Sequence, residues 1–454
     1  ASGVDLTQFR RWYDQAGTPV VDATGSYDAG RRRYTLTLRQ TCPPTPGQPD
    51  KLPFHIPVAV GLLDASGRDM PLQLEGESSP AAGTRVLSFT KAEQAYTFVN
   101  VPQVPLPSLL RGFSAPVNLR YDYGETGLAM LMAHDSDAFN RWEASQRLAL
   151  DLMLRGIGAV RAGQQPVFPE SFVEAFRRTL QNAKEDPAFA AEALGLPSEA
   201  YVAEQMDVVD ADAIHAVRVG LRKHLAASLS TELLSAYRIF ATSGDYSPDA
   251  ASAGRRSLRN LCLGYLMELD DGAIRSLCLK QFVSAGNMTD AMAALTAFAN
   301  TDCVERATVL EKFYAKWKDE PLVVDKWFAV QAASRLPGTL GEVKKLMQHP
   351  AFTIKNPNRA RSVIGSFCSG NHVRFHAADG SGYAFAADQV IALDALNPQV
   401  AARLARSFDR WRKFEPARQQ HSRSALERIR ATAALSKDTM EVVTKALAGQ
   451  QAAA

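Results

Sequence analysis

The sequence has few cysteines and no closely spaced cysteine pair. Its 454 residues include only Cys42, Cys262, Cys278, Cys303 and Cys368. The number is odd, the spacing is wide, and no Cys-x-x-Cys motif occurs. This pattern argues against a disulfide framework and a zinc ribbon, and it predicts reduced thiols in a cytoplasmic protein.

Long apolar runs and an excess of one charge are also missing. No stretch of about 18 apolar residues is present, so we expect no membrane-spanning helix. The 51 Lys and Arg against 48 Asp and Glu give a net charge of only +3, and the basic clusters are short, which argues against a nucleic-acid partner. The first residues contain neither an initiator Met nor a signal-peptide core. We therefore expect the chain to begin within a larger protein.

Residues 16–123 have the alternation of a β-domain. Tyr34, Leu36 and Leu38 alternate with polar residues, and Pro- and Gly-rich turns such as 42–49 separate the alternating segments. A period of two between such turns predicts short antiparallel strands. About 100 residues of this kind are typical of a β-sandwich.

From Gly124 onward the strand pattern gives way to helical periodicity. The predicted helices include 136–162, 229–242, 254–268, 357–369 and 398–414. Between about 254 and 369 the helices come in pairs of roughly 12–16 residues with wide apolar faces, which favours an α-solenoid of HEAT or armadillo type. The predicted fold is thus a multidomain chain, an antiparallel β-sandwich followed by a large α-helical superhelical domain.

The sequence contains no complete motif of a known catalytic site. His372 and His376 have a helical i, i+4 spacing, but Val373 stands where a zinc metalloprotease motif needs Glu. Two ordinary, partly exposed histidines are the simpler interpretation. Residues 380–382, Gly-Ser-Gly, are too short for a nucleophile elbow, and the segment Asp379–Tyr383 predicts a tight turn that caps a helix.

Two Asn-Pro pairs, Asn356-Pro357 and Asn397-Pro398, predict helix starts, because Asn is a preferred N-cap and Pro suits the first helical position. The residues that follow include Arg361 in the first helix, and Gln399 and Arg403 one turn apart in the second. Two interpretations stay open: ordinary surface or interhelical contacts, or a polar wall that lines a peptide cavity.

With these residues in view, the sequence resembles the C-terminal half of the bacterial aminopeptidase N family, which are zinc aminopeptidases of the gluzincin class. The resemblance covers nearly the whole chain and rests on short motifs in one order: Phe9–Tyr13 with Gly17–Pro19, His55–Pro57, Phe113–Val117, Phe139–Trp142, Asn287–Ala291, Asp325–Phe328, Asn356–Arg359, Asp379–Tyr383 and Asn397–Val400.

The resemblance implies three parts: 1–15 as the remnant of a preceding catalytic domain, 16–123 as a β-sandwich and 124–454 as the helical domain. The family's H-E-x-x-H zinc motif and its G-x-M-E-N motif do not occur here. The resemblance therefore implies that zinc is bound in the full-length parent protein and that none is bound by this chain. The implied partners are the missing N-terminal catalytic half and peptide substrates, and the chain should be inactive alone.

In the family the helical domain closes over the catalytic domain. By motif, Arg361, Gln399 and Arg403 are then the residues that face the peptide beyond the scissile bond, where an arginine fork suits a backbone carbonyl or a carboxylate. The rival hypothesis is a stand-alone α-solenoid scaffold that binds peptides or proteins.

Overall fold

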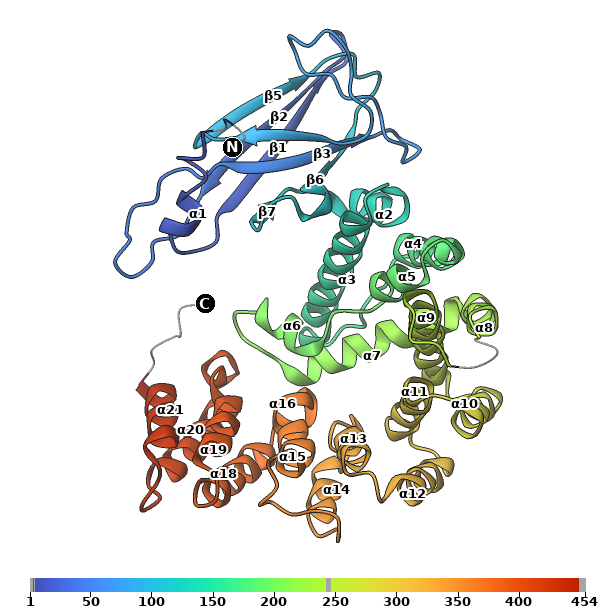
Figure 1. Ribbon diagram of the computed structural model, residues 1–454, viewed down its shortest axis with the longest axis vertical. Helices are drawn as coiled ribbons and strands as arrows, with labels where there is room; N and C mark the ends of the chain where they lie inside the picture. The colour runs from blue at the N-terminus through green and yellow to red at the C-terminus, as the bar shows by residue number, and fades with distance from the viewer. Residues whose placement is uncertain (1–2, 4, 242–245, 449–454) are drawn as a thin grey trace. The chain divides into compact units, whose positions relative to one another are not determined.

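The computed structural model describes residues 3, 5–241 and 246–448 (Figure 1). Three of the predicted segments include residues that the structure does not describe. Residues 1, 2 and 4 of the first segment, residue 242 of the helix predicted over 229–242, and residues 449–454 of the helical domain lie outside the description. By internal contacts the chain forms two compact units, one made of 1–149 and 169–195, the other of 150–168 and 196–454.

The first unit contains the predicted β-sandwich. One sheet has the strand order β5-β2-β1-β7 and the other the order β4-β3-β6. The pairings are antiparallel except that β7 runs parallel to β1, a departure from the expected all-antiparallel arrangement. The strands are β1 (Val20–Asp28), β2 (Arg33–Thr41), β3 (Ile56–Leu63), β4 (Arg85–Phe89), β5 (Glu93–Phe98), β6 (Leu106–Leu109) and β7 (Asn118–Arg120).

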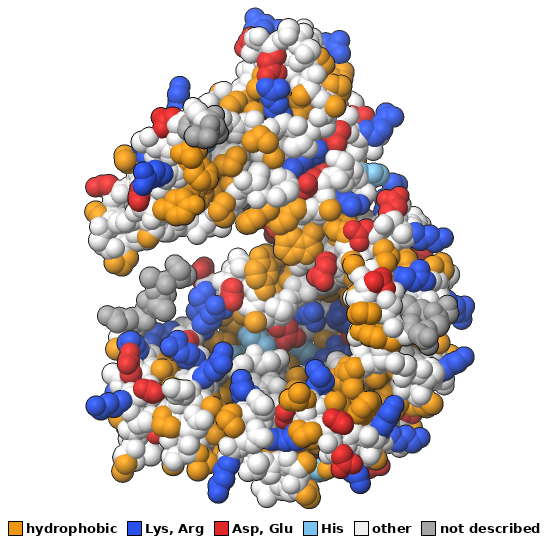
Figure 2. Space-filling view, in the orientation of Figure 1, with side chains coloured by type: hydrophobic (Ala, Val, Ile, Leu, Met, Phe, Trp, Pro, Cys, Tyr) orange, Lys and Arg blue, Asp and Glu red, His pale blue; other side chains and the backbone are white. Residues whose placement is uncertain are grey.

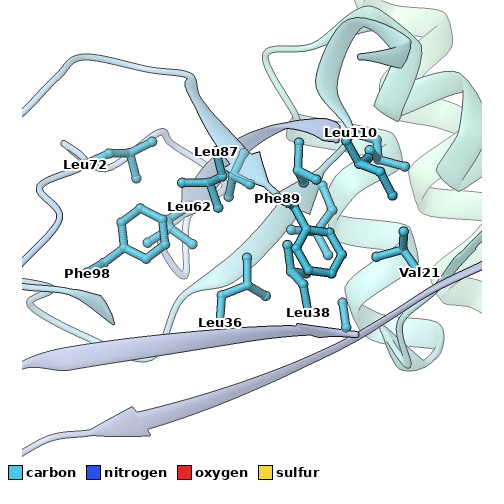
Figure 3. Packing of buried hydrophobic residues seen from close by; sticks show 14 of the residues in the cluster. Val21, Leu36, Leu38, Leu62, Leu72, Leu87, Phe89, Phe98 and Leu110 are labelled. Atoms are coloured by element: carbon cyan, nitrogen blue, oxygen red, sulfur yellow. The ribbon is translucent and has the colours of Figure 1, made fainter. Parts of the chain in front are cut away.

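The sandwich core follows from the alternation seen in the sequence. Tyr34, Leu36 and Leu38 of β2 are buried, whereas Arg39 between Leu38 and Gln40 is exposed. In Figure 3 the apolar side chains of the two sheets point toward one another, with Phe89 and Phe98 among the largest. Burial of this apolar surface is the main stabilising contribution to the sandwich.

The segment before β1 packs on the sandwich through a short helix, α1 (Arg11–Asp14). Trp12 donates a hydrogen bond from Nε1 to the carbonyl of His55, 2.9 Å away, and its ring lies 4.7 Å from that of Phe54. Gln8 donates to the carbonyl of Pro53 at 3.1 Å. The origin of residues 1–15 in another domain stays a prediction.

A buried arginine ties the sandwich to the first helices of the same unit. The side chain of Arg111 is 2% exposed. It donates to Ser108 and Thr84, to both carboxylate oxygens of Asp69, and to Asp135 at 2.8 Å. Gly61 makes room for it, since a Cβ there would lie 2.1 Å from the guanidinium carbon. The network crosses the predicted boundary at 123/124, which itself stays a prediction.

The described residues after β7 fold mainly into helices, as predicted. The helices are α2 (Gly124–His134), α3 (Ala138–Arg161), α4 (Glu170–Gln181), α5 (Pro187–Ala193), α6 (Glu199–Glu204), α7 (Ala211–Ser228), α8 (Ser230–Ile239), α9 (Ala250–Leu266), α10 (Gly272–Ser284), α11 (Met288–Ala299), α12 (Glu305–Trp317), α13 (Pro321–Ala332), α14 (Thr339–Leu346), α15 (Pro357–Ala360), α16 (Ser366–Gly370), α17 (His372–Phe375), α18 (Ser381–Asp394), α19 (Pro398–Ala405), α20 (Pro416–Arg430) and α21 (Lys437–Ala448).

The second unit stacks helix pairs in the manner of a solenoid. Helices α7, α9, α11, α13 and α16 contact one another in succession and form an inner row. Helices α8, α10, α12 and α14 form an outer row in Figure 1. Each outer helix packs on its inner neighbour, so the apolar faces are shared between successive pairs.

The predicted helix over 398–414 is shorter in the structure. Its α-helical part ends at Ala405, and two 3₁₀ turns, 406–408 and 411–413, follow. Trp411 donates from Nε1 to the carbonyl of Ala446, and Arg412 donates to that carbonyl as well. These contacts to the end of α21 hold the chain in a path that local periodicity does not specify.

Candidate functional site

The two predicted Asn-Pro helix starts are confirmed. The side chain of Asn356 accepts hydrogen bonds from the backbone N–H of Asn358 at 2.9 Å and of Arg359 at 3.4 Å. Asn397 accepts from the N–H of Val400 at 3.2 Å. Each cap satisfies backbone donors that the first helical turn would leave unpaired.

Arg361 lies on the surface beside a buried arginine. Arg359 is 9% exposed and forms an ion pair with Asp325, with 2.5 Å between Nη1 and Oδ1. Arg361 is exposed, and its guanidinium donates to Asn358 of its own helix. Arg361 also opens a five-residue π-helical turn, Arg361–Gly365, a feature that is frequent at functional sites.

Gln399 and Arg403 lie one turn apart on α19, and both are exposed. Within residues 3, 5–241 and 246–448, neither side chain takes part in a hydrogen bond or an ion pair. The structure thus brings Gln399 and Arg403 to one helix face, as the spacing predicts. No hydrogen bond or ion pair in the same range joins them to Arg361, so the three-residue wall stays a prediction.

A polar cluster in the second unit was not predicted from the sequence. His215 of α7 lies 2.7 Å from Glu199 of α6, between Nδ1 and Oε1. His372 of α17 lies 4.0 Å from the other oxygen of Glu199, and its ring lies 4.8 Å from that of His376. Figure 2 shows histidine side chains, with acidic and basic ones beside them, in the floor of a hollow in the helical region.

His376 connects this cluster to α18 and α20. Its ring stacks on Phe414 with centroids 4.1 Å apart, and its Nδ1 lies 2.8 Å from the hydroxyl of Tyr383. The carbonyl of His376 accepts a hydrogen bond from Arg418 at 2.6 Å, and Arg418 also pairs with Asp212 of α7. Both histidines are partly buried, so the interpretation as partly exposed residues holds, but each has specific neighbours.

Burial sets the electrostatics of the cluster. It lowers the pKa of His376 well below its ordinary value, and the nearby charges of His372 and Arg418 act in the same direction. Burial also lowers the pKa of His372, although Glu199 opposes this. Burial alone would raise the pKa of Glu199, but the hydrogen bond and charge of His215 outweigh it and lower that pKa.

We expect the helical unit to lose stability in mild acid because of His376. Its pKa is lowered in the folded state, so the contribution is fully present above the unfolded pKa of about 6.5 and is lost as the pH falls below it. His376→Gln should recover about 1 kcal/mol of this loss at pH 5.5. The measurement is the helical circular-dichroism melting curve between pH 7.5 and 5.5.

The control for this experiment is His421→Gln, which changes an exposed histidine. Its melting temperature should fall with pH as in the unchanged chain. Parallel pH profiles for His376→Gln and His421→Gln would show that His376 does not carry the acid sensitivity.

The fold defines the chain as an Ig-like β-sandwich followed by armadillo-type helical repeats. The family model DUF3458_C, a domain of unknown function described as ARM repeats, matches residues 125–448. The model DUF3458, a domain of unknown function with an Ig-like fold, matches residues 17–122. The chain belongs to the DUF3458_C family.

Relatives of known name match nearly the whole chain. Aminopeptidase N of Escherichia coli is 42% identical over 448 residues, which are 99% of this chain and 51% of that protein. Aminopeptidase N of Caulobacter vibrioides is also 42% identical, over 98% of this chain and 50% of that protein. The structure of Legionella pneumophila aminopeptidase A in complex with aspartic acid matches with a TM-score of 0.82 and 30% identity, over 98% of this chain and 51% of that chain.

The chain thus spans about half the length of the curated relatives it matches. The predicted resemblance to the C-terminal half of bacterial aminopeptidase N and the predicted fold class are confirmed. Among the residues that the structure describes, no helix combines the length and apolar character that crossing a membrane requires.

Proposed function

We propose that this chain is the non-catalytic half of a cytoplasmic zinc aminopeptidase that removes N-terminal residues from peptides. The observation that carries the proposal is the 42% identity to an aminopeptidase N across 99% of the chain. The five cysteines are free thiols, which is in keeping with a reducing compartment.

We propose that this chain contributes no ligand to the zinc site of such an enzyme. The described residues contain no group of three or more His, Cys, Asp or Glu side chains that could hold a metal ion. Neither the H-E-x-x-H nor the G-x-M-E-N motif occurs in the sequence. The proposal therefore assigns zinc and the chemical steps to a catalytic half, and binding to this chain.

The catalytic half needs a surface to dock on, and the start of the chain offers an apolar one. Leu6 is 52% exposed, Tyr13 84% and Leu52 60%. Gln15 exchanges hydrogen bonds with the backbone of Leu52, which holds these segments together. Figure 2 shows apolar side chains gathered on this side of the sandwich. Exposed apolar clusters of this kind mark interaction surfaces.

We further propose that the helical domain closes the active-site cavity, and that Arg361, Gln399 and Arg403 contact the peptide beyond the scissile bond. Gln399 and Arg403 support this role because they are exposed, share one helix face and have no protein partner within the described range. A guanidinium group without a partner offers a fixed fork of donors to a carbonyl or a carboxylate.

In a protein that joins this chain to its catalytic half, Arg403→Ala and Arg361→Ala should weaken a tripeptide substrate more than an alanyl anilide. The anilide has no peptide backbone after the scissile bond. Loss of one charge-assisted contact costs about 1.5–3 kcal/mol, or roughly ten- to a hundredfold in kcat/KM. Gln399→Ala should cost less, since a neutral hydrogen bond is weaker. The measurement is kcat/KM for both substrates.

Arg406→Ala is the matched control, because Arg406 is an exposed arginine directly after α19. It should leave both substrates unchanged. Equal losses on both substrates would assign the arginines to folding or domain closure. No loss on either would mean that they are ordinary surface residues, and no activity in the joined protein would favour the scaffold hypothesis.

A further inference from the structure

A recess with polar and apolar walls lies on the inner row of helices, and Arg361, Gln399 and Arg403 are not among its lining residues. It has a volume of about 510 Å³ and lies between α7, α9 and α11. One side carries three arginines: Arg218 and Arg222, one turn apart on α7, and Arg335, which follows α13. The other side is α11, where Met292, Ala293 and Ala297 are apolar and Thr289 and Thr296 are polar.

Positive charge in this recess exceeds the negative charge that faces it. The carboxylate of Glu268, 4% exposed, is shared by Arg222 and Arg335, each at 2.7 Å. Arg218 donates to backbone carbonyls, that of Pro197 at 2.8 Å and a neighbouring one at 3.5 Å. The acidic neighbour of Arg218 is Glu199, whose carboxylate is also 2.7 Å from Nδ1 of His215.

The pKa of the Arg218 side chain reflects this excess of positive charge. Burial lowers the pKa of Arg218, and the positive charges of Arg222 and Arg335 lower it further, although Glu199 opposes this. The Arg222 guanidinium is also held in place, since it donates to the carbonyl of Gly264 at 2.7 Å and lies over the ring of Tyr265. Fixed and partly buried like charges favour the binding of an anion.

The side chains that line the recess indicate which class of anion fits it. A carboxylate accepts paired hydrogen bonds from a guanidinium fork, and the small side chains of Ala293 and Ala297 leave space for an apolar group beside it. Phosphate has no apolar part to place against that wall. An amino acid at the end of a peptide has both parts, a carboxylate and a side chain.

We infer that this recess binds the terminal carboxylate of a peptide, with the last side chain against α11. The inference deepens the proposed function and rests on it for the source of the peptide. It adds a contact for the far end of the substrate, on helices other than those that carry Arg361, Gln399 and Arg403.

The probes are N-acetyl-leucine and N-acetyl-leucinamide, which differ only at the terminal group, a charged carboxylate in the first and a neutral amide in the second. In calorimetric titrations of the 454-residue chain, the acid should bind at least tenfold more tightly than the amide, as expected for a charge-assisted contact of roughly 1.5 kcal/mol or more. Arg218→Gln and Ala293→Phe should each weaken the acid about tenfold or more. The first removes a donor, and the second fills the recess without changing its charge.

Arg238→Gln, at an exposed arginine of α8, is the matched control and should bind like the unchanged chain. Arg222 and Arg335 stay unchanged because they hold the buried Glu268. Equal affinities for acid and amide, or full affinity in Ala293→Phe with a native circular-dichroism spectrum, would overturn the inference. Inorganic phosphate binding as tightly as the acid would also overturn it, in favour of a general anion site.

These results separate the inference from the proposed function. Binding of N-acetyl-leucine requires no catalysis and no second half of an enzyme. Selective binding of the acid together with an inactive joined protein would therefore overturn the aminopeptidase proposal and leave the carboxylate site standing.

Discussion

Arg111→Met is expected to lower the free energy of unfolding by about 3–5 kcal/mol, the usual cost of breaking a buried ion pair from one side. Asp135 has no side-chain exposure, and the substitution leaves its carboxylate without a cation. Burial already raises the pKa of Asp135, and Arg111 acts against that rise. Without Arg111, the carboxyl group must be buried as an unpaired charge or take up a proton.

Chemical denaturation of the whole chain, followed by circular dichroism, gives the measurement. Arg120→Met is the control, since Arg120 is 71% exposed and 3.9 Å from Asp22, and surface pairs of this kind contribute about 0–1 kcal/mol. Asp135→Asn on the Arg111→Met background should restore part of the loss because it removes the unpaired charge. A loss no larger than that of Arg120→Met would show that the network contributes little.

The second large effect is expected for Gly382→Ala. A Cβ at this position would lie 2.1 Å from the backbone oxygen of Phe375, which is closer than real Cβ contacts allow. Helices α17 and α18 would have to separate, and the packing of Phe375 on Tyr383, with centroids 5.4 Å apart, would be lost. We expect a loss of about 3 kcal/mol, the upper part of the range for overpacked cores.

The same substitution elsewhere provides the control. Gly158 lies inside α3, and a Cβ there would meet nothing within 4 Å. Gly158→Ala should therefore stabilise the chain by about 0.5–1 kcal/mol, since Ala is the better helix former. The two melting temperatures should shift in opposite directions. A neutral Gly382→Ala would mean that α17 moves aside without cost.

The local features of this chain were predictable because neighbouring residues produce them. The Asn356 and Asn397 caps are one example. Another is the turn before α18, in which Asp379 accepts a hydrogen bond from the N–H of Ser381 at 2.9 Å and Gly380 has a φ of 71°. In such cases a side chain bonds to backbone two or three residues away, so sequence spacing contains the geometry.

Features that depend on distant residues or short helices were not predicted. Glu199 lies 16 residues from His215 and 173 from His372 along the chain, and nothing in the local pattern of any of the three indicates the others. Helices α6 and α17 have only six and four residues, too few to show a period of 3.6. The pair His372 and His376 was visible as a spacing, but its acidic neighbour was not.

The Arg111 network shows the same limit for domain boundaries. The change in composition near Gly124 separates strands from helices, and the family models 17–122 and 125–448 follow that change. Contacts instead group the sandwich with α2, part of α3, and α4 and α5. Hydrogen bonds from Arg111 to Asp69 and Asp135 explain part of this grouping, because the stabilising contacts cross the point where the composition changes.

The π-helical turn at Arg361–Gly365 bears on how this segment tolerates insertions and deletions. A π-helical turn bonds each residue to the fifth along instead of the fourth, so it holds one residue more than an α-helical turn. The extra residue is absorbed within this turn, so deleting it would leave an ordinary α-helical turn and would keep the flanking turns in phase. Arg359 would stay beside Asp325 and Phe367 would stay buried, and only the side chains inside the turn would change direction. Two homologues that differ by one residue here would thus share a core and differ only in the side chains of this turn.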